Sequence, residues 1–358
     1  MVEGQSAATP VPGVVVVWTG ATPAILAFRI PAAGLVIGRE LLTETTDDRI
    51  SRQHARVAWG DRRFVVTDLG SRNGTYTGGN AVVDGEVTVT APSVVRTGRT
   101  VSVLLDDIRR FEGAAIAITH DAIVGPSTAA QWRAVEQAAH AGENLLILGE
   151  PGTGKGRMAR GYARARNRHE AVFNPLIQAV PLERVVSATT ETVILEQVGK
   201  LGPQNLATLG KLLERPELRF VTTAVMQLEH LGLPAELAEA LSARAVLVPP
   251  LRDRPEEMAF LVNDAVRSAE PGLQIHSTLA EVCLLRPWPG NVRELIAEVG
   301  RAAHTVAAQG KNNIRGEDLD NDAGHLMMGA PTINAAVQAT SANRPRRKRN
   351  SSRPNHDD

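Results

Sequence analysis

Residues 37–76 carry three short motifs, Ile37-Gly38-Arg39, Ser51-Arg52-Gln53-His54 and Asp68-Leu69-Gly70-Ser71-Arg72-Asn73-Gly74-Thr75-Tyr76. Each motif lies beside a short apolar run, and the run at 55–59 alternates as a half-buried strand does. The Asn-Gly pair is typical of a tight turn. The pattern predicts a β-sandwich that carries these motifs on loops clustered at one end.

The polar side chains of these loops suit an anionic ligand. Arg39 and Arg52 can form charge-assisted bonds to a phosphate dianion, and Ser51 can donate a hydroxyl bond. Asn73 carries a donor and an acceptor, which suits it to bind the backbone of an extended peptide. In order and spacing the motifs resemble the forkhead-associated (FHA) domain, a family that binds phosphothreonine peptides.

The resemblance covers about the first third of the chain and implies a role for each motif. The implied phosphopeptide-binding residues are Arg39, Ser51, Arg52, Arg72 and Asn73. The first three would hold the phosphate, and the last two would hold the peptide main chain. His54 would brace the loops without touching the ligand. The alternative is a sandwich that has lost binding, on which Arg39 and Arg52 are ordinary solvated arginines.

The composition limits the classes of protein that fit. The chain has 358 residues, enough for two domains, and its 39 Lys+Arg balance its 39 Asp+Glu, so no global charge recruits nucleic acid. The single cysteine, Cys283, excludes an internal disulfide and a multi-cysteine zinc site. No apolar run approaches the roughly 20 residues of a membrane span, and residues 1–13 do not resemble a signal peptide. We therefore expect a cytoplasmic protein with no membrane partner and no metal centre.

Changes in composition predict the domain boundaries. Short Val- and Thr-rich runs continue to about residue 106, and sequence of helical period follows the connector. The expected order is a flexible N-terminus at 1–13, the sandwich at 14–107, a connector at 108–120, an α/β core at 121–250, a helical lid at 251–325 and a disordered basic tail at 326–358.

A glycine-rich motif lies between the apolar run at 145–148 and a predicted helix at 157–166. This is the context of a Walker A motif, in which backbone amides approach the phosphates and the lysine reaches the terminal ones. The implied nucleotide-binding residues are Gly149, Glu150, Gly152, Thr153, Gly154, Lys155 and Gly156. The alternative is a strand-to-helix turn of the same fold that holds no nucleotide.

Two later motifs narrow the family. The segments 248–257 and 286–295 resemble the AAA+ domain of sigma-54-dependent transcription activators, and the resemblance extends over about residues 121–320. It implies a multidomain fold, an all-β FHA sandwich followed by an α/β P-loop AAA+ module with a small helical lid. The second motif predicts a helix that Asn291 and Glu294 begin as a capping box. Arg293 would face the nucleotide, and a plain surface arginine is the alternative.

The residues expected to support hydrolysis depart from that family. The strand that should end in Asp-Glu ends in Glu196-Gln197, and a glutamine cannot accept a proton as a base. Gly156 stands where the family carries a glutamate. The paired arginine fingers align with Pro234 and Ala240, neither of which carries a guanidinium, although Arg244 is nearby.

The segment expected to contact sigma-54 is also missing. Only 41 positions (196 − 155) separate Lys155 from Glu196, too few for the family's long insertion and its Gly-Ala-Phe-Thr-Gly-Ala loop. Residues 330–342 are likewise too short to build a helix-turn-helix, and the run Arg344-Pro345-Arg346-Arg347-Lys348-Arg349 predicts a basic tail instead.

These features predict a phosphorylation-dependent regulator or adaptor that binds a phosphothreonine protein. Its degenerate AAA+ domain would bind ATP weakly or not at all, would have no catalytic residue and would offer a surface to a protein partner; Mg2+ is left open. The main alternative is an ATP-dependent sigma-54-type transcription activator. A third alternative is a DNA-associated regulator that contacts phosphates through its basic tail.

Overall fold

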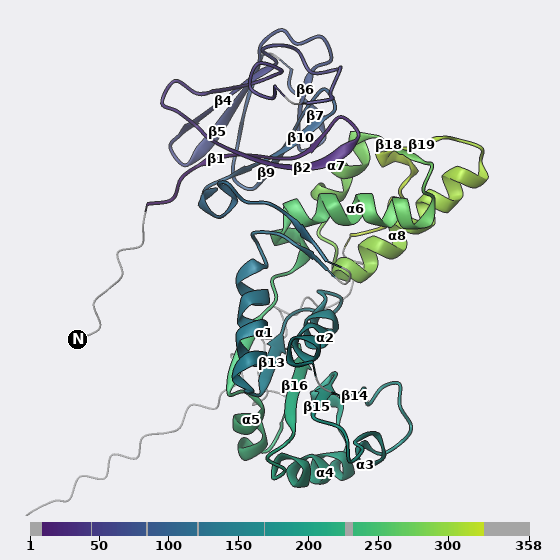
Figure 1. Cartoon of the computed structure of the whole chain (residues 1–358). Helices are drawn as coiled ribbons and strands as arrows, with labels where there is room; N and C mark the ends of the chain where they lie inside the picture. The colour runs from purple at the N-terminus through teal and green to yellow at the C-terminus, as the bar shows by residue number, and fades with distance from the viewer. Residues whose placement is uncertain are drawn as a thin grey trace, which may run out of the picture. The chain divides into compact units, whose positions relative to one another are not determined.

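The computed structural model describes residues 9–43, 45–83, 85–119, 122–167, 169–225 and 232–325 (Figure 1). Residues 1–8 of the predicted N-terminal segment and the whole predicted basic tail, 326–358, lie outside these ranges. The described residues up to His325 belong to one compact unit. None of the described helices is both long and apolar enough to cross a lipid bilayer. The cytoplasmic location stays a prediction.

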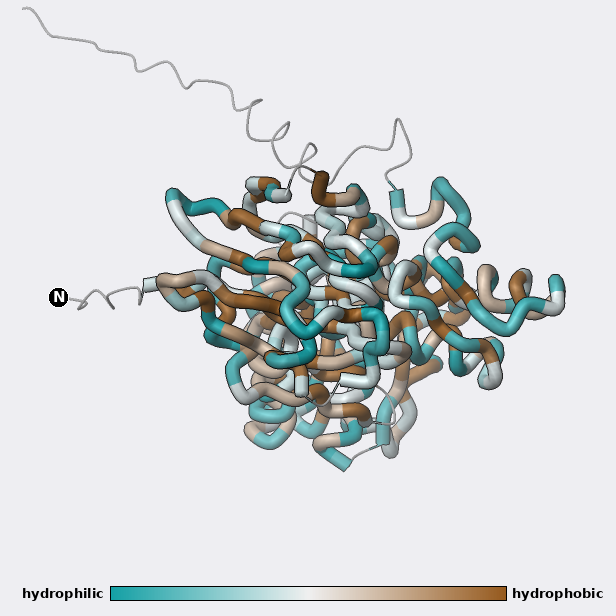
Figure 2. Tube along the Cα trace, turned by 90° about the horizontal axis from the view of Figure 1, so that it is seen from above, coloured by the Kyte–Doolittle hydropathy of each residue, from teal (hydrophilic) through white to brown (hydrophobic). Residues whose placement is uncertain are grey.

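The N-terminal part is a sandwich of two antiparallel sheets, with strand orders β2-β1-β10-β9-β6-β7 and β3-β4-β5-β8. The strands are β1 Gly13–Thr19, β2 Thr22–Arg29, β3 Leu35–Ile37, β4 Ala55–Gly60, β5 Arg63–Asp68, β6 Thr75–Thr77, β7 Asn80–Ala81, β8 Glu86–Val89, β9 Ser93–Thr97 and β10 Thr100–Leu105. Figure 2 shows hydrophobic and hydrophilic stretches following one another at short intervals along the trace, as such strands and turns require.

Strand β1 is buried on both faces, which explains its unbroken apolar run. Val14 and Val16 lie in the core between the two sheets. Val15 and Val17 point to the opposite face of the six-stranded sheet and belong to a second core. Because side chains alternate along a strand, burial on both faces removes the apolar/polar alternation that a half-exposed strand shows. The sandwich therefore has an outer face that is covered by another part of the chain.

A short connector joins the sandwich to the rest. It contains the 3-10 turn η1 Arg109–Phe111 and the antiparallel pair β11 Ala117–Ile118 and β12 Ile123–Val124. The following α/β core is a parallel five-stranded sheet of order β14-β15-β16-β13-β17. Its strands are β13 Leu145–Leu148, β14 Glu170–Phe173, β15 Thr192–Leu195, β16 Arg219–Ala224 and β17 Arg244–Leu247.

Helices cover both faces of this parallel sheet. The helices are α1 Ala129–Ala141, α2 Lys155–Arg166, α3 Leu182–Val185, α4 Pro203–Leu213 and α5 Ala235–Leu241, with the 3-10 turn η2 Val198–Lys200 after β15. Helices α1 and α2 pack on one face, and α3, α4 and α5 pack on the other. The central strands are buried throughout, as expected of a parallel sheet between two helical layers. The predicted sandwich followed by an α/β P-loop module is confirmed.

The last described part is a small helical lid. It comprises η4 Leu251–Asp253, α6 Pro255–Ala269, α7 Ser277–Leu285, α8 Asn291–Ala308 and η5 Gly316–Asp318, with a short parallel pair, β18 Gln274–Ile275 and β19 Asn313–Ile314. The apolar faces of α6, α7 and α8 share one core with the outer face of the sandwich. The lid thus contacts the sandwich directly, through side chains far apart in the sequence.

Candidate functional site

The three sequence motifs form loops that touch one another at one end of the sandwich. Gly38 follows β3, and a side-chain Cβ added at Gly38 would lie 2.0 Å from the carbonyl oxygen of Arg52. Arg39 N donates to the carbonyl oxygen of Ser51 at 3.0 Å. Only glycine permits this approach, so Gly38 brings the first and second motifs together.

His54 joins the second motif to the third. Its Nδ1 accepts a hydrogen bond from Ser51 N at 3.0 Å, so Nε2 carries the proton and donates to the carbonyl oxygen of Gly74 at 3.0 Å. The side chain is fully buried, and this burial lowers the pKa of His54, although the bond to Gly74 acts in the opposite direction. The neutral imidazole therefore braces the loops from inside, as the resemblance implied.

Asp68 holds the third loop in its turn. Its carboxylate accepts bonds from Ser71 N at 3.0 Å, Ser71 Oγ at 2.7 Å and Thr75 Oγ1 at 2.6 Å. Burial acts to raise the pKa of Asp68, but the bonds from Thr75 and Ser71 outweigh it and leave the pKa below its ordinary value. This anchor fixes the backbone on both sides of Arg72 and Asn73.

The predicted ligand residues all lie at this end of the sandwich. Arg72 N donates to Ser51 Oγ at 3.3 Å, and Asn73 Nδ2 donates to the carbonyl oxygen of Arg49 at 2.6 Å. Asn73 therefore binds the loop of Arg49 through its amide nitrogen. Sequence reasoning missed Arg49, although its place two residues before Ser51 could have indicated it.

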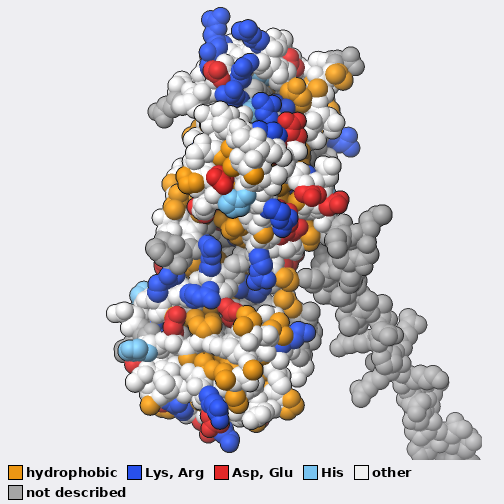
Figure 3. Space-filling view, turned by 90° about the vertical axis from the view of Figure 1, so that its right-hand side faces the viewer, with side chains coloured by type: hydrophobic (Ala, Val, Ile, Leu, Met, Phe, Trp, Pro, Cys, Tyr) orange, Lys and Arg blue, Asp and Glu red, His pale blue; other side chains and the backbone are white. Residues whose placement is uncertain are grey.

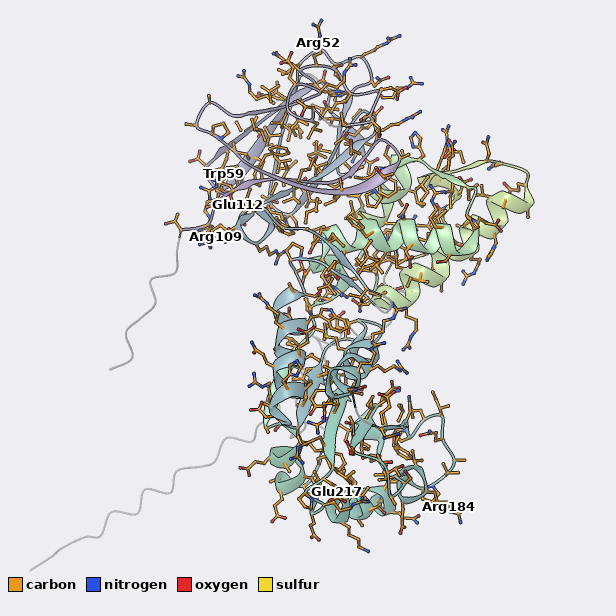
Figure 4. The ribbon with its side chains drawn as sticks, viewed as in Figure 1. Arg52, Trp59, Arg109, Glu112, Arg184 and Glu217 are labelled. Carbon is orange, nitrogen blue, oxygen red and sulfur yellow. The ribbon has the colours of Figure 1, made fainter. Side chains whose placement is uncertain are left out.

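The loops present four exposed arginines, Arg39, Arg49, Arg52 and Arg72. Within the described residues, none of their guanidinium groups forms an ion pair with a carboxylate. Figure 4 labels Arg52 at the top of the view, and Figure 3 shows Lys and Arg side chains gathered at that same end. An exposed cluster of unpaired guanidinium groups around a hydroxyl and an amide suits a dianionic group on an extended chain.

A second candidate site follows β13. The loop contains three glycines at positive φ, Gly149 at 150°, Gly152 at 77° and Gly154 at 103°, and it leads into α2 at Lys155. The first amides of a helix have no partner within the helix, and Lys155 N and Gly156 N form no hydrogen bond to another described residue, so both can face an anion. The backbone cradle therefore fits a phosphate.

Lys155 is turned toward its own loop. Its Nζ donates to the carbonyl oxygens of Gly149 at 2.7 Å and Glu150 at 2.8 Å. Burial, aided by the positive charge of Arg293, lowers the pKa of Lys155 from 10.5 to about 8. The ammonium group must exchange these carbonyl oxygens for phosphate oxygens when it binds a nucleotide.

The lid packs directly on this loop. The Glu150 carboxylate forms a bidentate pair with Arg252 at 2.6 and 2.9 Å and accepts a bond from Asn291 Nδ2 at 3.1 Å. A Cβ added at Gly152 would lie 1.9 Å from the carbonyl oxygen of Gly290. The backbone of Arg293 contacts the P-loop, since Arg293 N donates to the carbonyl oxygen of Gly152 at 3.4 Å. The role of the Arg293 side chain toward a nucleotide stays a prediction. Sequence reasoning missed Arg252 as a contact of this loop.

The predicted capping box at the start of α8 was wrong. Gly290 is the N-cap residue, and the Glu294 carboxylate accepts from Gly290 N at 2.7 Å. Asn291 is fully buried, has a φ of 54° and accepts from Leu251 N at 2.7 Å. The Asn291 side chain bonds to Glu150 of the P-loop and to Leu251 of the 3-10 turn η4, so it does not cap its own helix. These partners are distant in the sequence, and local sequence does not reveal them.

The space beneath the lid beside the loop is small. The cavity has a volume of about 40 Å3, and its walls include Thr153, Met158, Arg254, Leu261 and Val292. Small-molecule sites commonly occupy about 300–1,000 Å3. With the lid in this position the backbone cradle fits a phosphate, but the adjoining cavity does not fit a nucleoside.

The residues expected to support hydrolysis have partners of their own. Glu196 follows β15 and accepts from Asn174 Nδ2 at 2.9 Å, and its Oε1 lies 2.8 Å from the Cβ position of Gly156. Gln197 takes a left-handed backbone, and its N donates to Thr223 Oγ1 at 3.1 Å. Glycine at 156 thus leaves room for Glu196.

Arg244, the one nearby candidate for an arginine finger, is also paired. Its Nε lies 2.6 Å from Glu143 Oε2. Arg244 begins β17 opposite Leu145, the first residue of β13, whereas the P-loop follows the last residue of β13. Because the strands are parallel, Arg244 lies at the end of the sheet away from the P-loop of its own chain.

Two family models match this chain, one in the part with the sandwich loops and one in the part with the P-loop. Residues 35–98 match the family model of the FHA domain, and residues 125–251 match that of the Sigma-54 interaction domain. The predicted fusion is confirmed. The match to the FHA domain contains Arg39, Ser51 and Asn73, and the match to the Sigma-54 interaction domain contains the P-loop.

Several curated regulators are similar to this chain over half of its length or somewhat more. The transcriptional regulatory protein XylR of Pseudomonas putida is 27% identical over 238 residues, which cover 54% of this chain and 41% of XylR. The DNA-binding transcriptional regulator NtrC of Rhizobium meliloti is 27% identical over 268 residues, covering 61% of this chain and 54% of NtrC. The chain thus spans about half the length of these relatives.

A solved structure is similar to part of this chain. The crystal structure of NtrX from Brucella abortus in complex with ADP is 21% identical, with a TM-score of 0.49, and the match covers 61% of this chain and 59% of NtrX.

Proposed function

We propose that this protein is a phosphothreonine-dependent regulator. Its FHA domain binds a phosphorylated partner, and its sigma-54 interaction domain serves as a nucleotide-sensitive scaffold without useful ATP hydrolysis. The observation that carries the proposal is the cluster of four exposed arginines around Ser51 and Asn73, which form no ion pair with any carboxylate that the structure describes. The match to the FHA family supports a phosphothreonine ligand for that cluster.

The proposed ligand roles follow from the loop geometry. Arg39 and Arg52 meet where Gly38 brings the first two loops into contact, so both can reach one phosphate. Ser51 adds a hydroxyl beside them. Asn73 uses its amide nitrogen on Arg49, which leaves its Oδ1 to accept from a peptide N–H, and Arg72 lies next to it.

The test of phosphate binding compares two arginine variants. The wild type should bind the best ligand from a phosphothreonine peptide library in a calorimetric titration. Arg39→Ala should weaken this binding tenfold or more, because a hydrogen bond to a charged group contributes about 1.5–3 kcal/mol. The matched control is Arg63→Ala, since Arg63 is exposed at the start of β5, where the β4–β5 turn enters the strand and away from the loops. Equal affinity of wild type and Arg39→Ala would contradict the proposal.

The nucleotide part of the proposal rests on the backbone cradle. Gly152, Gly154 and the amides of Lys155 and Gly156 would hold the phosphates of ATP, and Lys155 would neutralise them once it leaves its loop carbonyls. Bound nucleotide would supply negative charge at the lid boundary, near Arg293. A fluorescent ATP analogue should therefore bind at micromolar or weaker affinity, and Lys155→Ala should reduce the signal. A lack of signal at millimolar analogue would make the loop purely structural.

The Sigma-54 interaction domain match favours a second function, an ATP-dependent transcription activator. It requires hydrolysis, which Gln197 in the place of a base and the lack of a guanidinium at Pro234 and Ala240 oppose. Phosphate release that depends on Lys155 would support this second function. The third alternative, DNA binding through the basic tail, concerns residues outside the described ranges and is tested by deleting residues 343–358.

A further inference from the structure

The outer face of the FHA domain and the lid share one hydrophobic core. Val15, Val17 and Trp18 from β1 lie in the same cluster as Met258 and Val262 from α6, and all five side chains are 1% exposed or less. Such a contact resists separation because apolar surface would return to water on both sides. The lid therefore cannot move away from the sandwich at little cost.

A buried ion pair crosses this contact. Arg96 Nε on β9 lies 2.6 Å from Glu281 Oε2 on α7, and the two side chains are 14% and 5% exposed. Within the described residues, Glu281 Oε1 has no hydrogen-bond partner. The charge of Glu281 thus depends on Arg96, because a buried carboxylate without a cation is strongly unfavourable.

Arg96 also contacts the strand that follows the peptide-binding loop. Its guanidinium carbon lies 3.9 Å from the centroid of the Tyr76 ring, and Tyr76 pairs with Arg96 across β6 and β9. Tyr76 stands three residues after Asn73, and the intervening Gly74 accepts the bond from His54. The loop that would hold the peptide therefore continues directly into the residue that positions Arg96.

The lid at its other end closes on the P-loop. Gly290 meets Gly152, and Asn291 and Arg252 bind Glu150. The cavity beneath the lid measures about 40 Å3, too small for a nucleoside. Binding of a complete nucleotide therefore requires the lid to shift from the position in which the sandwich holds it.

We propose that phosphopeptide binding at the FHA loops and nucleotide binding at the P-loop oppose each other through this lid. The inference rests on the proposed phosphopeptide function. A bound peptide orders residues 72–76, holds Tyr76 against Arg96 and strengthens the Arg96–Glu281 pair, which keeps α7 and the lid closed. Thermodynamic linkage requires the reverse effect to be equal, so bound nucleotide weakens peptide binding by the same factor.

The experiment is a pair of titrations on the full chain. The first measures the Kd of a fluorescent ATP analogue with and without a saturating phosphothreonine peptide chosen from a library; the second measures the Kd of the peptide by calorimetry with and without the analogue. We expect both Kd values to rise by the same factor, about fivefold or more. A Kd for the analogue that is unchanged or lowered by the peptide would overturn the proposal.

A variant tests whether the coupling passes through the ion pair. In Arg96→Met/Glu281→Met both charges are removed together, so no buried charge is left unpaired, and each ligand should still bind alone. In this variant, the Kd of each ligand measured with the other ligand present should agree within twofold with its Kd measured alone. The matched control is Arg301→Met, which removes the lid pair between the exposed Arg301 and Glu298 and should keep the full factor. Coupling that survives in the double variant would overturn the role of the pair.

The outcomes separate this proposal from the proposed function. If the peptide does not bind the wild type in calorimetry, the phosphopeptide function fails and the coupling fails with it. If the peptide and the analogue each bind but neither changes the other's Kd, the function stands and only the coupling is overturned. If the analogue does not bind, the coupling is likewise overturned.

Discussion

The two sites of the molecule that could hold phosphate, the FHA loops and the P-loop, differ in whether their charged side chains already have partners. At the FHA loops, the guanidinium groups are exposed and have no carboxylate partner among the described residues. At the P-loop, Lys155 is bonded to its own loop carbonyls, and Glu150 is paired with Arg252. The first end can accept an anion without breaking an existing contact. The second end must exchange contacts first.

A sequence motif alone therefore does not determine how easily a site can accept its ligand. Exposed unpaired charges are solvated by water and keep a high local field for a ligand. Charges that are paired inside the protein gain from that pairing, and a ligand must compete with it.

The largest expected effect concerns ATP hydrolysis. The purified chain should release phosphate at near-background rate, because an arginine finger contributes about 10³–10⁵ in rate and a general base about 10²–10⁴. Gln197→Glu should stay inactive, since it restores only one of these groups. The measurement is a phosphate-release assay over a range of protein concentrations, with Lys155→Ala as the baseline. Clear release by the wild type above that baseline would remove the contrast between the two ends.

The second prediction concerns the buried brace of the FHA loops. His54→Ala should lower the free energy of unfolding by about 2–3 kcal/mol, from two hydrogen bonds of about 1 kcal/mol each and a cavity. Urea denaturation measures this change. Gln53→Ala, at an exposed neighbouring position, is the control and should have little effect. Equal stability of the two variants would show that the loops do not depend on His54.

The third prediction concerns the charge of Lys155. Its pKa of about 8 means that the ammonium form dominates below pH 8 and is lost as the pH rises through that value. Affinity for a fluorescent ATP analogue should therefore fall between pH 7 and 9, roughly in proportion to the charged fraction. The affinity of Lys155→Arg for the analogue should change little between pH 7 and 9, because a guanidinium stays charged. A wild-type affinity that is flat to pH 9 would contradict this account.

The smallest expected effect is a pH dependence of stability from His54. Because burial lowers its pKa, the unfolded chain binds the proton more readily than the folded chain does. The stability contributed by neutral His54 is complete above the ordinary value of 6.5 and is lost as the pH falls toward and through the folded pKa. His276 shifts in the same direction, so the comparison of wild type with His54→Gln isolates the effect. The free energy of unfolding, measured by denaturation at pH 5 and at pH 7.5, should differ less between the two pH values in His54→Gln than in the wild type.

Local sequence predicted the elements whose cause is local. The glycines at 149, 152 and 154 indicated the P-loop because each takes a positive φ that other residues avoid. The Gly-Arg, Ser-x-x-His and Asn-Gly motifs indicated the FHA loops, and the structure brings Arg39, Ser51, Arg52, Arg72 and Asn73 to one end of the sandwich. The capping prediction failed at Asn291 because a distant partner, Glu150, competes for its side chain.

Hydrophobic period, turn residues and short motifs act over a few neighbouring positions, so they predict the two kinds of domain, their order and the residue types that could bind a phosphate. Which of the described charges have partners depends on tertiary contacts. The carbonyl oxygen of Arg49 accepts a bond from Asn73, and Lys155 donates to a carbonyl oxygen of its own loop. Arg96 donates to Glu281, which lies 185 positions further along the chain. Such contacts depend on the packing of the sandwich, the core and the lid, and that packing has no signature within any one segment.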